Sequence, residues 1–446
     1  MVRDFLILQL TGEIMFEKIF KLKHHNTNVR TELIAGLTTF MTMAYILALN
    51  PLVMEKAGMS PSAVFTTTAI AAIIGTLIMA FYANLPIGLA PGVAASAFFA
   101  FTIVIAMGHT WQFALTAVLF EGIIFVLLTA CKIREMIIDA IPDCMKNAIS
   151  CGIGLFIAFI GFTNAGIVKQ GAGTPMTLGN FHAIPTVLAL LGIVITGVLL
   201  VKRVKGALLI AIIIIALIGI PLGITHVPKA SSLLSLPPSI KPIFFQFQFH
   251  DIFTVNMLIT VITLLFMELF DTIGTLLGLA TKAGLLDKNG KLPNIKQALF
   301  ADAYGTTAAS VLGTCTVTAY VESAAGVAEG GKTGLTAFVI AVCFIISLFI
   351  SNIFLAIPSI ATAPILIIVG VFMLSPIKDL NFNDFSESIP CFLTLIIMPL
   401  SYSISDGIVI GMISYVLIKL LSGKWRDLNW FIIILTALFA LKLIEL

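Results

Sequence analysis

Residues 313–331 read GTCTVTAYVESAAGVAEGG, and residues 85–97 read LPIGLAPGVAASA. Both stretches are rich in small and polar residues, although long apolar runs flank them. The helical part of 313–331 is too short to cross a hydrocarbon layer of about 30 Å. Non-helical backbone at membrane depth persists only where it is buried in protein or lines a cavity. The two stretches therefore predict half-helices that meet inside a membrane protein and offer free N–H groups to a ligand. Close helix packing is the alternative explanation for the small residues.

The composition excludes a water-soluble fold. Of 446 residues, 59% are hydrophobic and 11% are charged, whereas soluble domains carry about 25% charged residues. The apolar runs lack the alternation of a barrel, so we expect an all-α polytopic membrane protein. The net charge of +3 is small and scattered, which argues against a nucleic-acid partner. The six Cys and six His residues fall at no ligand spacing, so we expect no metal and no cofactor.

Charged residues, Pro and Gly divide the chain into fourteen runs of membrane-spanning size. The expected spans are 30–50, 62–83, 91–108, 113–131, 147–166, 182–201, 206–224, 254–281, 296–313, 318–330, 333–353, 359–373, 386–403 and 405–421. A final run, 430–445, is either a further span or an interfacial helix. Basic residues gather in the N-terminal tail and after spans 4, 6 and 8, with Lys132 and Arg134 among them, which predicts a cytoplasmic N-terminus. The external segment 225–253 is expected to form a short extended ribbon.

Spans 1–7 and 8–14 can be laid side by side. An Ile-Pro dipeptide precedes span 5 at 141–142 and span 12 at 357–358. An odd number of spans in each half gives the halves opposite orientations, which is the inverted repeat of secondary transporters.

Five acidic residues lie in or at the ends of apolar spans with no basic residue near them in sequence. They are Glu121, Glu268, Asp271, Asp302 and Glu322. An ionised carboxylate is costly in a membrane, so each is expected to be protonated, hydrated, paired or bound to a ligand or cation. Small or hydroxylated residues follow Asp271 and Glu322, which favours ligand binding for these two. A structural bond to a neighbouring helix is the alternative for the others, above all for Glu121.

Five motifs resemble the azaguanine-type hypoxanthine/guanine/adenine permease branch of the nucleobase–ascorbate transporter superfamily. They are TELIAGLTTFMTMAYILALNP (31–51), LAPGVAASAFFAF (89–101), LFDTIGTLLGLATKAGLLD (269–287), ADAYGTTAASVLGT (301–314) and TAYVESAAGVAEGGKTGLTA (318–337). The resemblance runs from about residue 16 to the C-terminus. It implies two intertwined seven-helix inverted repeats behind a cytoplasmic tail, 1–29. Spans 1–4 (30–131) and 8–11 (254–353) would form a core domain, and 147–224 and 359–446 a gate domain.

The resemblance also implies a function. The expected activity is import of purine nucleobases across the cell membrane by an elevator motion, coupled to protons, with sodium as the alternative ion. A homodimer in the lipid bilayer is the expected assembly. Carried over by position, the substrate-binding residues are Asp271, Glu322, Ser323, Ser96, Ala95, Phe98, Phe99 and Thr275. Proton coupling would fall to Glu268, Asp302 and Glu121.

The third span departs from the family pattern. Residues 90–99 read APGVAASAFF where the family reads APGMGLNAFF, so Ala94 and Ser96 replace a Gly and an Asn. The change removes an amide that donates and accepts at once, which leaves another planar heterocycle or a small organic anion as the alternative cargo. We find no HExxH and no Ser/His or Cys/His constellation, so we expect no enzyme activity.

Overall fold

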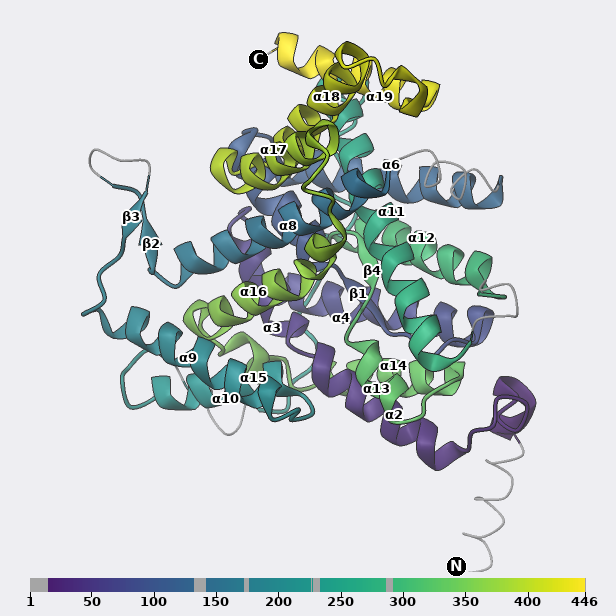
Figure 1. The fold of residues 1–446 in the computed structure, drawn as a ribbon. Helices are drawn as coiled ribbons and strands as arrows, with labels where there is room; N and C mark the ends of the chain where they lie inside the picture. Colours follow the sequence, from purple (N-terminus) through teal and green to yellow (C-terminus); the bar gives the residue numbers. More distant parts are fainter. Residues whose placement is uncertain are drawn as a thin grey trace, which may run out of the picture.

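The computed structural model describes residues 15–131, 142–171, 176–225, 227, 233–285 and 292–445. Lys132 and Arg134 lie outside them. The fold is built mainly of helices (Figure 1). The helices are α2 (Val29–Met43), α3 (Ile46–Glu55), α4 (Pro61–Ile78), α5 (Val93–Ala97), α6 (Trp111–Ala130), α8 (Asp143–Asn164), α9 (Ile184–Val201), α10 (Ala207–Gly219), α11 (Val255–Ala283), α12 (Ile295–Leu312), α13 (Ser323–Ala328), α14 (Gly334–Leu348), α15 (Ser351–Leu355), α16 (Ser359–Met373), α17 (Phe385–Ser401), α18 (Ile404–Leu421) and α19 (Trp430–Glu445). The π-helical segments η1 (Met79–Ala83) and η2 (Phe98–Ala106) extend α4 and α5.

Each of the fourteen expected spans contains a helix. Among the described residues, seven helical segments are long and apolar enough to cross a membrane, and five shorter apolar ones accompany them. The remaining two spans hold α12, which is rich in polar and small residues, and α13, which has six residues. Run 430–445 is helical as α19, and whether it crosses the membrane stays a prediction.

The helices pack in two groups (Figure 1). In the first group, α12 contacts α4 and α6, and α14 contacts α2 and α4. In the second group, α16 contacts α8 and α9, and α17 contacts α8 and α18. How the residue ranges divide into a core and a gate domain stays a prediction.

Two short strands interrupt the third and tenth spans, and they are called the crossed strands below. Strand β1 (Leu89–Pro91) pairs antiparallel with β4 (Val317–Ala319), and Leu89 lies opposite Ala319. Both strands are fully buried, as backbone at membrane depth must be. Strand β1 leads into α5, and β4 leads into α13. The prediction of two interrupted spans is therefore confirmed.

Two threonines hold these strands in the same way. The Thr76 hydroxyl on α4 accepts from the Leu89 N–H and donates to the Leu89 carbonyl, both at 2.9 Å. The Thr306 hydroxyl on α12 makes the same two bonds with Val317, both at 3.1 Å. Helices α4 and α12 are the second spans of the two halves, so the repeat extends to individual hydrogen bonds.

The segment after α10 differs from the expectation. Residues 233–253 contain turns and no strand. Pro237, Pro238 and Pro242 lack the N–H that strand pairing needs. The rings of Phe245, Phe247 and Phe249 pack against one another instead. The prediction of an extended ribbon is wrong for this part of the chain; a small sheet forms earlier, between β2 (Val168–Lys169) and β3 (Thr177–Leu178).

Candidate substrate-binding site

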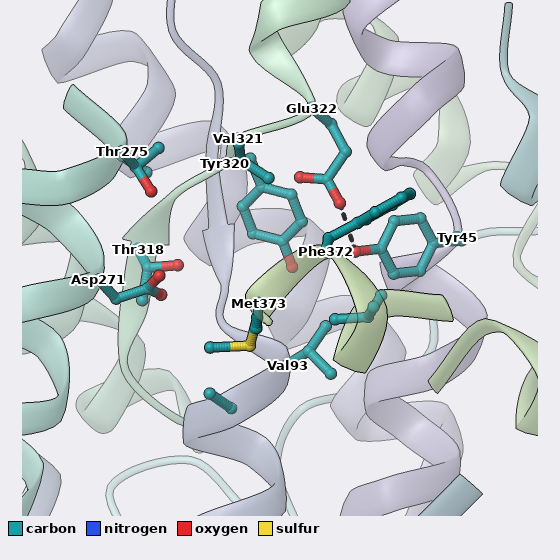
Figure 2. Close-up of a pocket in the computed structure, with 13 residues that line it drawn as sticks. Tyr45, Val93, Asp271, Thr275, Thr318, Tyr320, Val321, Glu322, Phe372 and Met373 are labelled. Carbon is teal, nitrogen blue, oxygen red and sulfur yellow. Dashed lines mark hydrogen bonds between the residues drawn. The ribbon is translucent and has the colours of Figure 1, made fainter. Parts of the chain in front are cut away.

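A cavity lies beside the crossed strands (Figure 2). The lining residues come from both groups of helices and from β4; they are Tyr45, Val93, Ala94, Asp271, Thr275, Thr318, Ala319, Tyr320, Val321, Glu322, Val369, Phe372 and Met373. The last three lie on α16, so the cavity lies between the two groups.

Two carboxyl groups face this cavity from different elements. Asp271 lies on α11 with Thr275 one turn later, and Glu322 precedes α13. The Tyr45 hydroxyl donates to Glu322 Oε1 at 2.7 Å. Figure 2 shows Asp271 beside Thr318 and Glu322 beside Tyr45, with Tyr320 between the two acids. Among the residues that the structure describes, no basic side chain lines the cavity, so its charged groups accept hydrogen bonds and suit a ligand that presents N–H donors.

Ser323 supports the site from behind and does not line the cavity. Its buried hydroxyl accepts the Gly88 N–H at 3.1 Å, just before β1. The bond ties the start of α13 to the opposite half-span. Glu322 therefore lies on a segment that continues from β4 and is bonded to the residue before β1.

Ser96 and Ala95 are also buried outside the cavity lining. The Ser96 hydroxyl lies 2.6 Å from Asn50 Oδ1 and 2.8 Å from the Gly92 carbonyl, and it donates to one of them at a time. Because α5 turns Val93 and Ala94 toward the cavity, the following residues face the protein interior. The departure at position 96 therefore lies in a supporting network, whereas that at Ala94 lies at the cavity itself.

The two phenylalanines expected to contact the substrate lie in the hydrophobic core instead. Phe98 and Phe99 are fully buried in η2 and do not line the cavity, because the π-helical turn packs them into the hydrophobic core. The aromatic lining consists of Tyr45, Tyr320 and Phe372. A sequence signal existed for one of these: Thr318, Tyr320 and Glu322 alternate with the period of a strand. Phe372 on α16 carried no such signal.

Two further predicted residues, Glu268 and Asp302, meet at Thr272 behind Asp271. The Thr272 hydroxyl donates to Glu268 Oε1 at 2.6 Å and lies 3.3 and 3.2 Å from the carboxyl oxygens of Asp302. All three side chains are buried. Thr272 directly follows Asp271 on α11, so this acid cluster begins one residue from the cavity.

Glu121 is linked to the crossing strands from α6. The Thr316 hydroxyl donates to Glu121 Oε2 at 2.6 Å, and both side chains are buried. The Thr316 carbonyl also accepts the Gly92 N–H at 2.9 Å. Glu121 thus anchors the strand pair.

The apolar spans, the inverted repeat and the cavity between two helix groups define a multi-pass membrane permease. Residues 30–410 match a family described as the permease family, and the chain belongs to it. It is a transport protein and not an enzyme. The resemblance to the purine branch of the nucleobase–ascorbate transporters is confirmed.

Two relatives match almost from end to end. The chain is 42% identical over 427 residues to the adenine permease AdeQ of Escherichia coli, covering 96% of both chains. It is 44% identical over 430 residues to the guanine/hypoxanthine permease PbuO of Bacillus subtilis, covering 95% of this chain and 99% of that one. Among solved structures, the transmembrane domain of a cyanobacterium bicarbonate transporter, BicA, superposes with a TM-score of 0.62 at 16% identity, over 86% of this chain and 97% of that one. This likeness shows the fold alone.

Proposed function

We propose that this protein is a secondary active transporter that imports purine nucleobases. The observation that carries the proposal is the pair Asp271 and Glu322, which face one cavity whose described lining contains no basic side chain. A purine presents ring and exocyclic N–H donors that carboxylates accept, and flat faces that tyrosine and phenylalanine rings can cover. The names of the relatives, adenine and guanine/hypoxanthine permeases, point to the same cargo.

Protons are the proposed coupling ion, with sodium as the alternative. The buried acids Glu268 and Asp302 meet at Thr272, directly beside Asp271 in the sequence. Buried acids close to a binding site are suited to exchange protons as the ligand arrives and leaves. Glu121 would then steady the crossing strands close to this cluster.

An elevator motion is the proposed route across the membrane. The core domain, 30–131 and 254–353, would carry the base past the gate domain, 147–224 and 359–446. The cavity supports this division, because the acids come from the core ranges and Phe372 and Met373 come from the gate range. We further propose a cytoplasmic N-terminus, a place in the cell membrane and a homodimer.

Uptake by cells that lack their own base transporters tests the cargo. Labelled adenine, guanine, hypoxanthine, xanthine and uracil would be offered at mildly acidic and neutral pH, with and without a protonophore. We expect saturable purine uptake that the protonophore abolishes. Glu322→Gln should lose uptake, whereas Glu55→Gln, a matched change at an exposed residue at the end of α3, should keep it. Undiminished uptake by Glu322→Gln would remove Glu322 from the site.

A different planar heterocycle is the second candidate cargo. Ala94 lines the cavity where the family has Gly, which narrows the space by a methyl group. A small organic anion fits less well, because the two carboxylates of the described lining would repel it. Competition by unlabelled heterocycles against the best labelled purine separates these cargoes.

A further inference from the structure

The hydroxyl of Thr272 lies between two buried carboxyl groups from different helices. Its oxygen is 2.6 Å from Glu268 Oε1, one turn earlier on α11, and 3.2 Å from Asp302 Oδ2 on α12. A threonine hydroxyl has one proton and two lone pairs, so it donates to only one carboxyl oxygen at a time. The shorter contact assigns its proton to Glu268.

A hydrogen bond at the remaining contact takes a second proton. With the Thr272 proton directed to Glu268, Asp302 bonds to the Thr272 oxygen only if Asp302 itself is protonated and donates, since an ionised carboxylate has acceptors alone. This geometry suits one proton held by the pair of acids.

The surrounding charged groups also favour one proton on the pair Glu268 and Asp302. The groups that act on Glu268 are Asp302 from α12, Glu121 from α6 and Asp271 on its own helix, and all are acids. Asp406 lies in the first turn of α18, which also packs on α11. Two ionised carboxylates in contact would repel each other strongly at low dielectric, and a shared proton removes that repulsion.

We propose that Thr272 is a positioning residue that makes Glu268 and Asp302 a store for one proton beside the substrate cavity. The inference rests on the proposed function in one respect: the stored proton is the one coupled to uptake. The relay balances. Asp302 gives its proton to the Thr272 oxygen while the original Thr272 O–H proton passes to Glu268, so one proton moves and the hydroxyl is restored.

Infrared spectroscopy of the purified full-length protein in lipid tests the store without relying on transport. At neutral pH we expect the carbonyl stretch of a protonated carboxyl group, shifted in Thr272→Val and retained in Thr272→Ser. Asp302→Asn should remove it. Thr263→Val is the matched control, because Thr263 is another buried threonine of α11, whose hydroxyl donates to Ser405. A spectrum of Thr272→Val identical to that of the wild type would overturn the inference.

The pH profile of uptake gives a second measurement. Thr272 accepts from protonated Asp302, so its loss lets the pair release its proton at a lower pH. We expect Thr272→Val to move the midpoint of the uptake profile downward by about one pH unit, with KM for the base little changed, and Thr272→Ser to restore the profile. An unchanged midpoint in Thr272→Val would count against the inference. The expected infrared result together with protonophore-insensitive uptake would support the store and refute proton coupling.

Discussion

Gly75 of α4 and Gly305 of α12 face each other where the two helices contact Val317 of β4. A β-carbon on Gly305 would lie 3.4 Å from Gly75 Cα and 3.1 Å from a methyl of Val317. One on Gly75 would lie 3.2 Å from the same methyl. Each glycine directly precedes the threonine that holds a strand. The pair therefore sets how closely α4 and α12 approach, and with it the position of β1 and β4.

Replacing Gly305 with Leu should destabilise the fold. Overpacking a tight interior costs about 1–3 kcal/mol, so we expect a lower melting temperature and a lower yield of folded protein in detergent. Gly305→Ala should be milder, because the Val317 methyl has to move only slightly. Gly278→Leu is the control, since nothing lies within 4 Å of a β-carbon there. Equal melting temperatures for Gly305→Leu and Gly278→Leu would contradict the prediction.

Tyr45→Phe should weaken substrate binding. The Tyr45 hydroxyl fixes one oxygen of the Glu322 carboxylate, and a hydrogen bond to a charged group contributes about 1.5–3 kcal/mol. We expect KM for the base to rise about tenfold or more, with the amount of protein in the membrane unchanged. Initial uptake rates over a range of concentrations measure this. Tyr304→Phe, at an exposed residue of α12, should behave as the wild type; a KM for Tyr45→Phe within twofold of it would argue against the role.

Glu32→Ala should loosen the start of α14. The fully buried Glu32 carboxylate on α2 accepts the N–H groups of Lys332 and Thr336 at 3.0 and 3.2 Å, and the Thr336 hydroxyl at 2.6 Å. Removing a helix cap costs about 0.5–2 kcal/mol, and the freed buried donors add to this. Thermal unfolding should show a clear loss of stability, a smaller loss for Glu32→Gln, and none for the exposed Glu55→Ala. A wild-type melting curve for Glu32→Ala would refute the capping role.

His109 should make the fold less stable in acid. It lies in the loop before α6, stacked on Phe113 with ring centroids 4.0 Å apart. Burial lowers the pKa of His109 from 6.5, against a smaller opposing effect of Asp251. As pH falls through about 6.5, the unfolded chain takes up the proton first, so stability decreases toward the lower folded pKa. His109→Gln should flatten this acid-side slope in melting temperature, whereas the exposed His182→Gln should leave it steep.

Sequence patterns located the helices and interruptions. The family resemblance singled out Asp271, Thr275 and Glu322; these three line one cavity, and their role in binding stays a prediction. Which residues surround these acids was less predictable. Phe98 and Phe99 stand beside the half-helix in sequence, yet the π-helical turn directs them into the core. Phe372 lines the cavity only because the packing of α16 brings this distant helix beside the crossed strands.

The sequence by itself determined that the chain spans a membrane, where its helices break and which acids lack a basic neighbour. These properties follow from hydropathy, Gly, Pro and charge, which act over a few residues. Only the tertiary structure decided which side chains share a cavity or a hydrogen bond. Tyr45 and Glu322 are 277 positions apart, and Thr272 and Asp302 are 30 apart. Their contacts depend on how whole helices pack, and no local pattern of residues encodes that packing.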